Sequence, residues 1–372
     1  MIYLAVLLSI AIHSCYAGSK VVVSLYALEL GASEALVGIL ASLYGAVPLF
    51  LAVFAGRLAD TIGMRAPMIA GALCVVASML VSALWPGMPA LFATATLIGA
   101  GFILFNVPIQ TLAGALGTPA ERTRNYSLLS IGYSTSSLLG PTFGGFAIEY
   151  VGHPAAFGGF AALATLPVVA LALTGRLTDV PRQEAAKKER SALELLRAPE
   201  LRRIVISSGL LVSAWELYVF YLPIHAHEAG ISPSRIGLIL GAFALAAILV
   251  RFALPWVLKR VSEAALLTAA TLFSAAGFLA LPLFSTAAPL MALSFAIGLG
   301  MGCGQPVMMT LAYNRSPAGR SGEVAGLRLM ANNVARVAVP LVSGALGAAF
   351  GTAPVFWINA ANLVVASRLA GR

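Results

Sequence analysis

The chain has 372 residues, of which 60% are apolar and only 10% carry a charge, whereas soluble domains have about 25% charged residues. This composition excludes a soluble globular protein and indicates a chain that crosses a membrane many times. The net charge of +9 would suit a nucleic-acid-binding protein if the basic residues formed one face, but they lie in the connectors between apolar runs.

Apolar runs of about 20 residues, long enough to cross a hydrocarbon core, recur along the whole chain. Lipid offers no partners to backbone N–H and C=O groups, so these runs must be helices. The sequence therefore predicts an all-α membrane protein with about twelve membrane-spanning helices. Their expected spans are residues 4–28, 35–56, 66–85, 88–114, 124–148, 154–174, 203–224, 233–256, 264–284, 287–312, 322–348 and 351–369.

The basic residues are distributed asymmetrically. Most of the 23 Lys and Arg residues fall in alternate connectors and in the C-terminal tail. Cytoplasmic loops carry this excess, so these connectors and both termini are expected to be cytoplasmic. We expect a multi-pass protein of a bacterial inner (plasma) membrane.

The two halves of the chain repeat each other without a gap. Gly31 aligns with Gly230 and Pro141 with Pro340 at one constant offset. Matched proline and glycine over so long a stretch indicate two six-helix bundles, related by a pseudo-twofold axis along the membrane normal. The predicted parts are an N-terminal bundle (1–174), a cytoplasmic linker (175–202) and a C-terminal bundle (203–372).

Two motifs carry a resemblance to a known family. The stretch from Gly56 to Arg65, GRLADTIGMR, resembles the signature connector of the major facilitator superfamily, and LGPTFGG at 139–145 resembles the GPxxGG motif of its proton-coupled exporters. With the helix count and the repeat, the chain resembles this superfamily over its full length, most closely the drug and metabolite exporter branch. Thr61, Met64 and Ala95 depart from the family pattern, so coupling residues cannot be carried over.

The resemblance also implies a role for the connector. Asp60 ends the second helix, where the helix dipole disfavours an acid. The family implies a partner at the start of the eleventh helix, near Ser321-Gly322-Glu323, and hence a cytoplasmic latch. The alternative is a turn that only sets topology. The latch candidates are Gly56, Arg57, Asp60, Gly63 and Arg65, and the helix-packing candidates of the second motif are Gly140, Pro141, Gly144 and Gly145.

Charged residues within the spans need a partner or a water-filled cavity. We expect Glu216 to be the protonatable group, and Arg336 and Lys20 to attract an anionic or zwitterionic substrate. The repeat alignment places Glu216 and Arg336 at similar depths in the membrane, so the two side chains could form an ion pair. The alternative is that this pair is static and only fixes how the two helices pack. Arg251 and Arg328, near cytoplasmic helix ends, are expected to extend to the membrane surface.

Polar amides and aromatic residues within the spans provide further candidates, because they need an interior face in lipid. Each could contact substrate or could join helices by hydrogen bonds. These candidates are Asn106, Gln110, Tyr133, Trp215, Tyr218, Gln305, Asn332 and Asn333.

The expected function is secondary active transport by alternating access, with proton-coupled export of a small amphiphilic or anionic solute. One alternative is a proton-coupled symporter that imports an organic anion, and another is a transport-inactive receptor or scaffold. No nucleophile and base arrangement suggests an enzyme, and no cofactor or metal site is expected. The expected partners are the substrate, the proton and the lipid bilayer, with no nucleic acid, and the resemblance implies a monomer.

Overall fold

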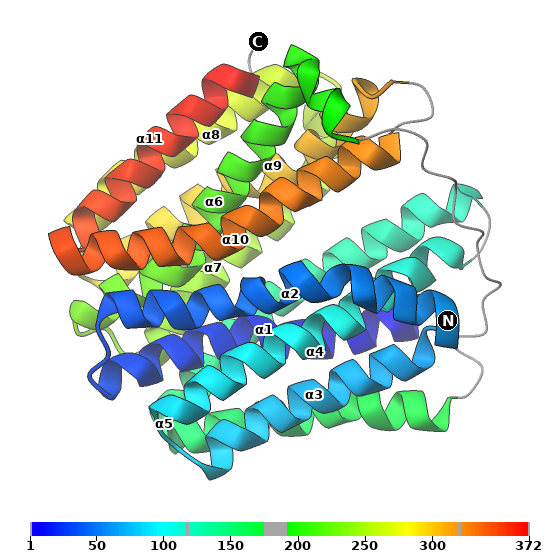
Figure 1. The fold of residues 1–372 in the computed structure, drawn as a ribbon. Coiled ribbons are helices and arrows are strands. Elements are labelled where there is room, and N and C mark those ends of the chain that lie inside the picture. Colours follow the sequence, from blue (N-terminus) through cyan, green and yellow to red (C-terminus); the bar gives the residue numbers. More distant parts are fainter. Residues whose placement is uncertain (1, 117–118, 175–191, 318–320, 371–372) are drawn as a thin grey trace. The chain divides into compact units, whose positions relative to one another are not determined.

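The computed structural model describes residues 2–116, 119–174, 192–317 and 321–370, and every regular element in these ranges is a helix (Figure 1). In chain order they are α1 (Ile2–Glu29), α2 (Glu34–Ile62), α3 (Arg65–Leu84), α4 (Met88–Ala115), α5 (Pro119–Leu173), η1 (Ala192–Arg197), α6 (Pro199–Glu228), α7 (Pro233–Val257), α8 (Glu263–Ala280), η2 (Leu281–Leu283), α9 (Ala287–Asn314), α10 (Ser321–Phe350) and α11 (Thr352–Ala370).

The predicted helical fold is confirmed, with one difference in α5. This element joins the fifth and sixth predicted spans across a kink at Gly152, whose φ of 81° lies outside the helical region. Ten described helices, with α5 counted once, are long and apolar enough to cross a membrane. Helix α11 is not among these ten, since Asn359, Asn362 and Arg368 lower its hydropathy.

The described end of the segment between the halves is helical. Helix α6 begins at Pro199, before the expected start at 203, so the last residues of the predicted linker are helical. A short 3-10 helix, η1, precedes α6. The rest of the predicted linker, 175–191, lies outside the described residues.

The chain divides into two compact units, the first comprising residues 1–184 with 232–241 and the second 185–231 with 242–372. In the first unit α1 packs along α5, while α4 packs against both α2 and α3. In the second unit α6 contacts α9, α10 and α11, and α8 packs between α9 and α11. In each unit, therefore, the first long helix packs against helices that come late in the same half of the chain: α1 packs against α5, and α6 packs against α10 and α11.

The tight turns show the internal repeat in the backbone. Gly31 and Gly230 have φ of 82° and 73°, and Gly152 and Gly351 have φ of 81° and 79°. At Gly31 and Gly230 the following residue donates its N–H to the carbonyl five residues earlier, at 2.9 and 3.0 Å. Glycine is required because other residues rarely adopt this backbone conformation.

The GPxxGG stretch lies where α5 approaches its neighbours. A Cβ atom on Gly140 would lie 2.5 Å from the carbonyl oxygen of Ser14 and 2.8 Å from the nitrogen of Gly18, both in α1. A Cβ on Gly145 would collide with the carbonyl of Pro233, in the first turn of α7, which belongs to the first unit. The small residues allow backbone contact that larger side chains would prevent.

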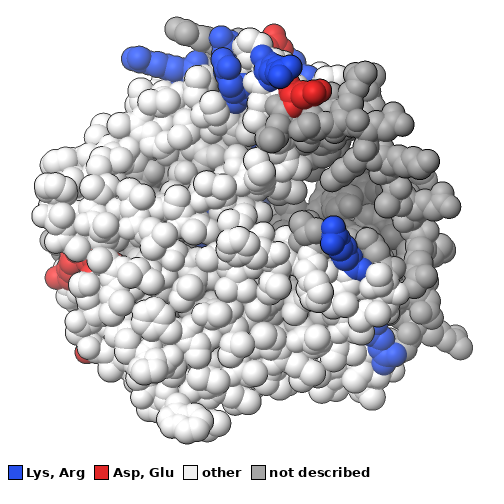
Figure 2. Space-filling view, in the orientation of Figure 1, with Lys and Arg blue, Asp and Glu red and all other residues white. Residues whose placement is uncertain are grey.

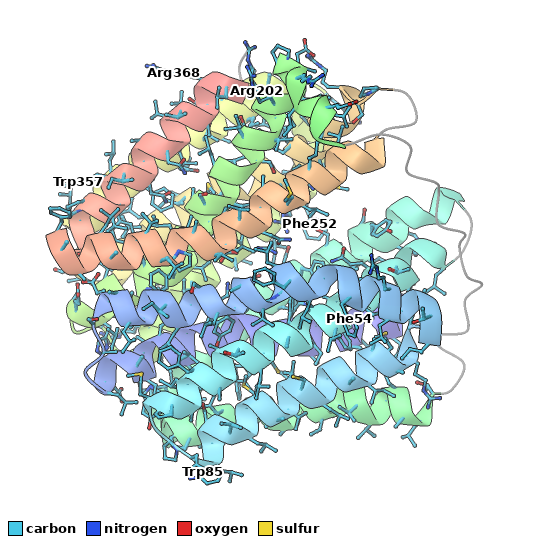
Figure 3. All side chains as sticks on the ribbon, in the orientation of Figure 1. Phe54, Trp85, Arg202, Phe252, Trp357 and Arg368 are labelled. Atoms are coloured by element: carbon cyan, nitrogen blue, oxygen red, sulfur yellow. The ribbon has the colours of Figure 1, made fainter. Side chains whose placement is uncertain are left out.

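Large apolar side chains cover the outward faces of the helices. Phe50 is 80% exposed and Trp85 is 79% exposed, as expected for surfaces that face lipid. Charged side chains gather over the part of the second unit where α6 begins and α11 ends, near Arg202 and Arg368 (Figures 2 and 3). The second unit therefore has a charged end, and it also has exposed apolar side chains, such as Trp256 (69% exposed) and Phe350 (70% exposed).

We expect Gly140→Ala to lower the thermal unfolding midpoint, because the added methyl group would overlap the α1 backbone. Overpacking of this kind costs about 1–3 kcal/mol. Gly158→Ala is the matched control in the same element, since a Cβ there meets nothing within 4 Å. Equal midpoints for the two purified variants would contradict the close α1–α5 contact.

Candidate functional site

Aromatic side chains collect around α1 in the first unit. The His13 ring stacks on Tyr133 with centroids 4.0 Å apart, and Tyr16 stacks on Phe102 at the same distance. Tyr44 meets Tyr16 edge-on at 5.5 Å. These rings come from α1, α2, α4 and α5, so the cluster joins four helices of one unit.

Lys20 extends over this cluster. Its Nζ lies 5.0 Å from the centroid of the Tyr16 ring and 5.9 Å from that of Tyr44. Ring faces attract cations, by about 0.5–2 kcal/mol. The ammonium group is therefore held against aromatic faces within the unit.

Two predicted polar residues lie at the same cluster. The Tyr133 hydroxyl donates to Asn106 Oδ1 at 3.0 Å, which links α5 to α4. Gln110, one helical turn further along α4, is exposed. The structure thus brings Asn106, Tyr133 and Lys20 to one aromatic cluster. His13 contacts Tyr133 and Tyr16 contacts Lys20, and neither His13 nor Tyr16 was among the predicted substrate residues.

The second unit contains an ion pair within its membrane-spanning helices. Arg336 Nε lies 3.3 Å from Glu216 Oε1, joining α10 to α6. The Glu216 side chain is only 11% exposed, while that of Arg336 is 46% exposed. Arg336 also reaches Asn333 Oδ1 at 3.5 Å. The expected pairing is therefore present, with the acid buried and the cation more accessible.

A second polar group lies one to two turns earlier on α10. The Asn332 side chain is 3.0 Å from Ser208 Oγ, and with its amide nitrogen on that side it also reaches the carbonyl oxygens of Ser208 and Arg328 at 3.3 and 3.2 Å. Arg328 Nη1 donates to Gln305 Oε1 at 2.9 Å. Asn332 and Gln305 thus connect α10 to α6 and to α9.

The expected extension of Arg328 to the membrane surface is wrong. Its side chain is buried, with 7% of the residue exposed, and turns toward α9. Arg251 also turns inward, and its Nε donates to the carbonyl of Gly302 at 3.1 Å. That carbonyl is available because Pro306, four residues later, has no N–H to donate. Both arginines therefore contact the same turn of α9, and the positions of these residues in the sequence did not predict that they meet there.

The aromatic candidates of α6 take part in packing. Tyr218 is fully buried and stacks on Phe243 with centroids 4.2 Å apart. Trp215 meets the same Phe243 ring edge-on at 4.7 Å. In this structure the two residues hold α6 against α7.

The connector motif is described only in part. Gly63 ends α2 with φ of 85°, and Arg57 is exposed. Arg65 donates from Nε to the Leu171 carbonyl at 2.9 Å, and from Nη2 to the next carbonyl at 2.8 Å, at the end of α5. A cation suits the unsatisfied carbonyls of a helix C-terminus.

The remaining elements of the predicted latch lie outside the described side chains. They are the Asp60 side chain and the side chains of Ser321-Gly322-Glu323. The latch therefore stays a prediction.

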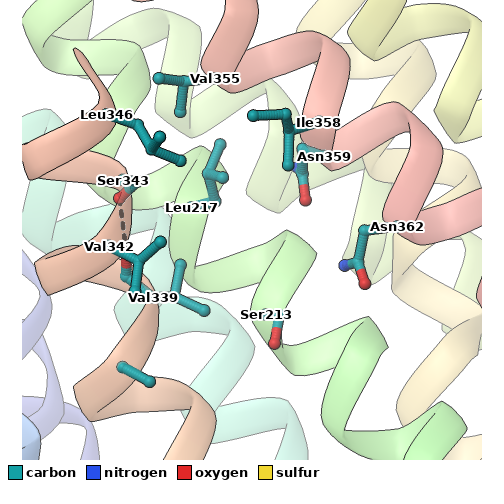
Figure 4. A pocket seen from close by; sticks show the side chains of 11 residues that line it. Ser213, Leu217, Val339, Val342, Ser343, Leu346, Val355, Ile358, Asn359 and Asn362 are labelled. Atoms are coloured by element: carbon teal, nitrogen blue, oxygen red, sulfur yellow. Dashed lines mark hydrogen bonds between the residues drawn. The ribbon is translucent and has the colours of Figure 1, made fainter. Parts of the chain in front are cut away.

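A separate pocket of about 250 Å³ lies between α10 and α11, over α6 (Figure 4). Its lining is mostly apolar, with Ser213, Ser343, Asn359 and Asn362 as the polar residues. The two asparagine amides donate to main-chain carbonyls of α6 at 3.3 and 3.0 Å. The lining includes none of the predicted substrate residues. Two amides three residues apart in an apolar helix were the available signal for this pocket.

Apolar helices that contain an ion pair and hydrogen-bonded amides inside their spans define a multi-pass membrane protein. A family model described as the Major Facilitator Superfamily matches residues 3–284 and 204–370. The chain belongs to this superfamily.

Curated relatives match over a shorter region. The multidrug resistance protein MdtH of Edwardsiella ictaluri is 32% identical over 133 residues, which is 36% of this chain and 33% of that protein. MdtH of Yersinia enterocolitica is 31% identical over 125 residues, 34% of this chain and 31% of that protein. The similarity spans about a third of these relatives' length.

Solved structures share the fold over nearly the whole chain. A POT family transporter in complex with a thioalcohol-conjugated peptide has a TM-score of 0.81 at 16% identity, covering 99% of this chain and 94% of that one. The nucleoside transporter NupG has a TM-score of 0.82 at 14% identity, covering 100% and 99%. At such identities the likeness shows the fold alone.

We expect Arg336→Gln to destabilise the protein more than Glu216→Gln. Removing the arginine takes the cation from a buried carboxylate, whereas removing the carboxylate leaves a cation that is half exposed. Leaving the buried Glu216 carboxylate without the Arg336 cation costs roughly 1–3 kcal/mol. Thermal unfolding of both single variants and the double variant measures the difference. An equal or larger loss for Glu216→Gln would contradict this view of the pair.

Proposed function

We propose that the protein is a secondary active transporter that couples proton movement to export of a small amphiphilic or anionic solute. The observation that carries this proposal is the Glu216–Arg336 pair within the membrane-spanning helices of a Major Facilitator Superfamily chain. Acids inside membrane spans are costly and mark proton or ion pathways.

The chemistry of the pair supports a proton-linked switch. With Glu216 ionised, its carboxylate attracts the Arg336 guanidinium at 3.3 Å. Protonation removes the negative charge and weakens that attraction, so the guanidinium becomes available to an anionic group of the substrate. The ionised Glu216 carboxylate and a substrate anion would thus compete for the Arg336 guanidinium, and protonation of Glu216 would favour binding of the anion.

Within the first unit, the aromatic cluster around α1 is a separate candidate region for binding the apolar groups of a solute. Tyr16 is half-buried and contacts the buried rings of Tyr44 and Phe102, and the Lys20 ammonium group lies beside Tyr16 and Tyr44. Aromatic pockets with a few polar groups are typical of small-molecule sites. The names of the MdtH relatives, multidrug resistance proteins, support export of such a solute.

A second candidate is a proton-coupled symporter that imports an organic anion. The excess of cations inside the spans favours it, because Lys20, Arg328 and Arg336 lie within membrane-spanning helices, as does the acid Glu216. The two candidates share the proton and the anion and differ in the direction of substrate movement.

We also propose that the chain lies in a bacterial inner membrane with both termini cytoplasmic. The basic side chains near Arg202 and Arg368 gather where α6 begins and α11 ends. Positive residues at that end support a cytoplasmic position.

We expect Glu216→Gln to abolish concentrative transport while substrate exchange continues, because the amide cannot release or bind the coupling proton. Inside-out vesicles with an imposed pH gradient measure accumulation of ethidium as a cationic probe and carboxyfluorescein as an anionic probe. A control with substrate on both sides and no gradient measures exchange.

Glu200→Gln is the matched control for that experiment. Glu200 forms an exposed ion pair with Arg315 at 2.7 Å in the same unit, so its loss should leave gradient-driven accumulation unchanged. Gradient-driven accumulation by Glu216→Gln at the wild-type level would exclude Glu216 as the coupling group.

A further inference from the structure

Arg328 lies in an unusual setting beside Pro306 of α9. Arg328 is 7% exposed, and its one hydrogen-bond partner among the described residues is the neutral carboxamide of Gln305. Its Nε is buried without a hydrogen-bond partner in that same part of the chain, and no described carboxylate lies within 4 Å of it. The guanidinium therefore carries a net charge that these contacts do not balance.

Such a charge is costly in a low-dielectric region. An amide oxygen supplies a dipole but no opposite charge, and an isolated buried cation costs several kcal/mol. An arginine guanidinium has five donors in a planar fork that matches carboxylate and phosphate oxygens in pairs. Arg328 uses one of these donors for Gln305, and its Nε is buried without a hydrogen-bond acceptor among the described residues.

A second guanidinium reaches the same turn of α9. Arg251 donates to the Gly302 carbonyl, and Arg328 donates to Gln305. Gly302 and Gln305 are three residues apart, so they lie on one face of the helix. The proline at 306 explains the position of Arg251, because it frees the Gly302 carbonyl to accept this bond.

We propose that Arg328 and Arg251 form an oxyanion site beside Pro306 of α9, which binds a carboxylate or phosphate group. The site is distinct from the Glu216–Arg336 pair, since Arg328 precedes Arg336 by eight residues, about 12 Å along α10. Asn332 lies between them and ties α10 to α6. An anion that leaves Arg336 toward the N-terminal end of α10 would meet Arg328 next.

Binding to this site does not depend on transport direction or proton coupling. The proposed function is needed only for the idea that a transported substrate anion binds here as well as at Arg336. The oxyanion can belong to a free solute or to a lipid headgroup, because basic pockets between membrane helices also bind anionic lipids.

The test is thermal unfolding of the purified full chain in detergent, with sodium phosphate compared with sodium chloride at matched ionic strength. Wild-type protein should gain about 2 °C or more in phosphate, because a ligand that binds the native state stabilises it. Arg328→Gln should lose this difference. Arg368→Gln, which removes an exposed arginine of the same unit, should keep it.

Phosphate also stabilises proteins without specific binding, so the difference between the Arg328 and Arg368 variants carries the result. A full phosphate response in Arg328→Gln would overturn the proposal. If Arg328→Gln does not fold, Arg251→Gln is tested in its place, with phosphate binding measured by equilibrium dialysis of radiolabelled phosphate. Phosphate binding by Arg251→Gln at the wild-type level would overturn the proposal.

A second arm distinguishes the source of the anion. Nanodiscs of phosphatidylcholine are compared with nanodiscs that also contain phosphatidylglycerol. Stabilisation by phosphatidylglycerol that Arg328→Gln abolishes would support the site with a lipid phosphate as its ligand. Absence of an Arg328-dependent response to either free phosphate or phosphatidylglycerol would overturn the proposal.

The Glu216 pair provides an internal comparison. Glu216→Gln should show at least the wild-type phosphate response even where it loses concentrative transport, because a neutral residue 216 also leaves Arg336 available to an anion. The oxyanion site and the proposed coupling mechanism can therefore fail independently.

Discussion

The absence of hydrogen-bonding partners in hydrocarbon is the constraint on which the structure depends. Backbone groups meet it by forming helices, and polar side chains meet it by turning toward other helices. Arg65 does so at the end of α5, where it donates to two main-chain carbonyls. Asn359 and Asn362 do so in α11, where both donate to carbonyls of α6. In each case a polar residue in an apolar chain also joins two helices.

The same constraint separates structural charges from functional ones. A charge that is balanced by backbone carbonyls at a helix end, such as Arg65, is explained by packing. The Glu216–Arg336 pair differs, because its acid is buried while its cation is half exposed, so a proton or an anion can alter it. Arg328 differs again, since it is buried against a neutral amide. These two groups therefore carry the functional proposals, one for coupling and one for anion binding.

A proline inside a helix frees a main-chain carbonyl, which a side chain of a neighbouring helix can then bind. Pro306 removes one main-chain bond from α9, and Arg251 replaces it from another helix. Glycine has the corresponding effect at close contacts, where Gly140 allows α5 to approach the α1 backbone. Bends and contacts of this kind position charged groups that lie far apart in the sequence.

The sequence by itself determined the helical class, the order of the spans and the internal repeat, because hydropathy and glycine positions report on local preferences of the backbone. It also indicated the Glu216–Arg336 pair, since the repeat register related their depths. It did not predict the inward turn of Arg328, the bond from Arg251 to Gly302 or the capping role of Arg65. Each of these contacts joins a side chain of one helix to a particular group of another helix, and it forms only where packing brings the two together. Only the packed tertiary structure decides that, because rotation of each helix about its axis is set by close contacts between side chains and not by the hydropathy of any single segment.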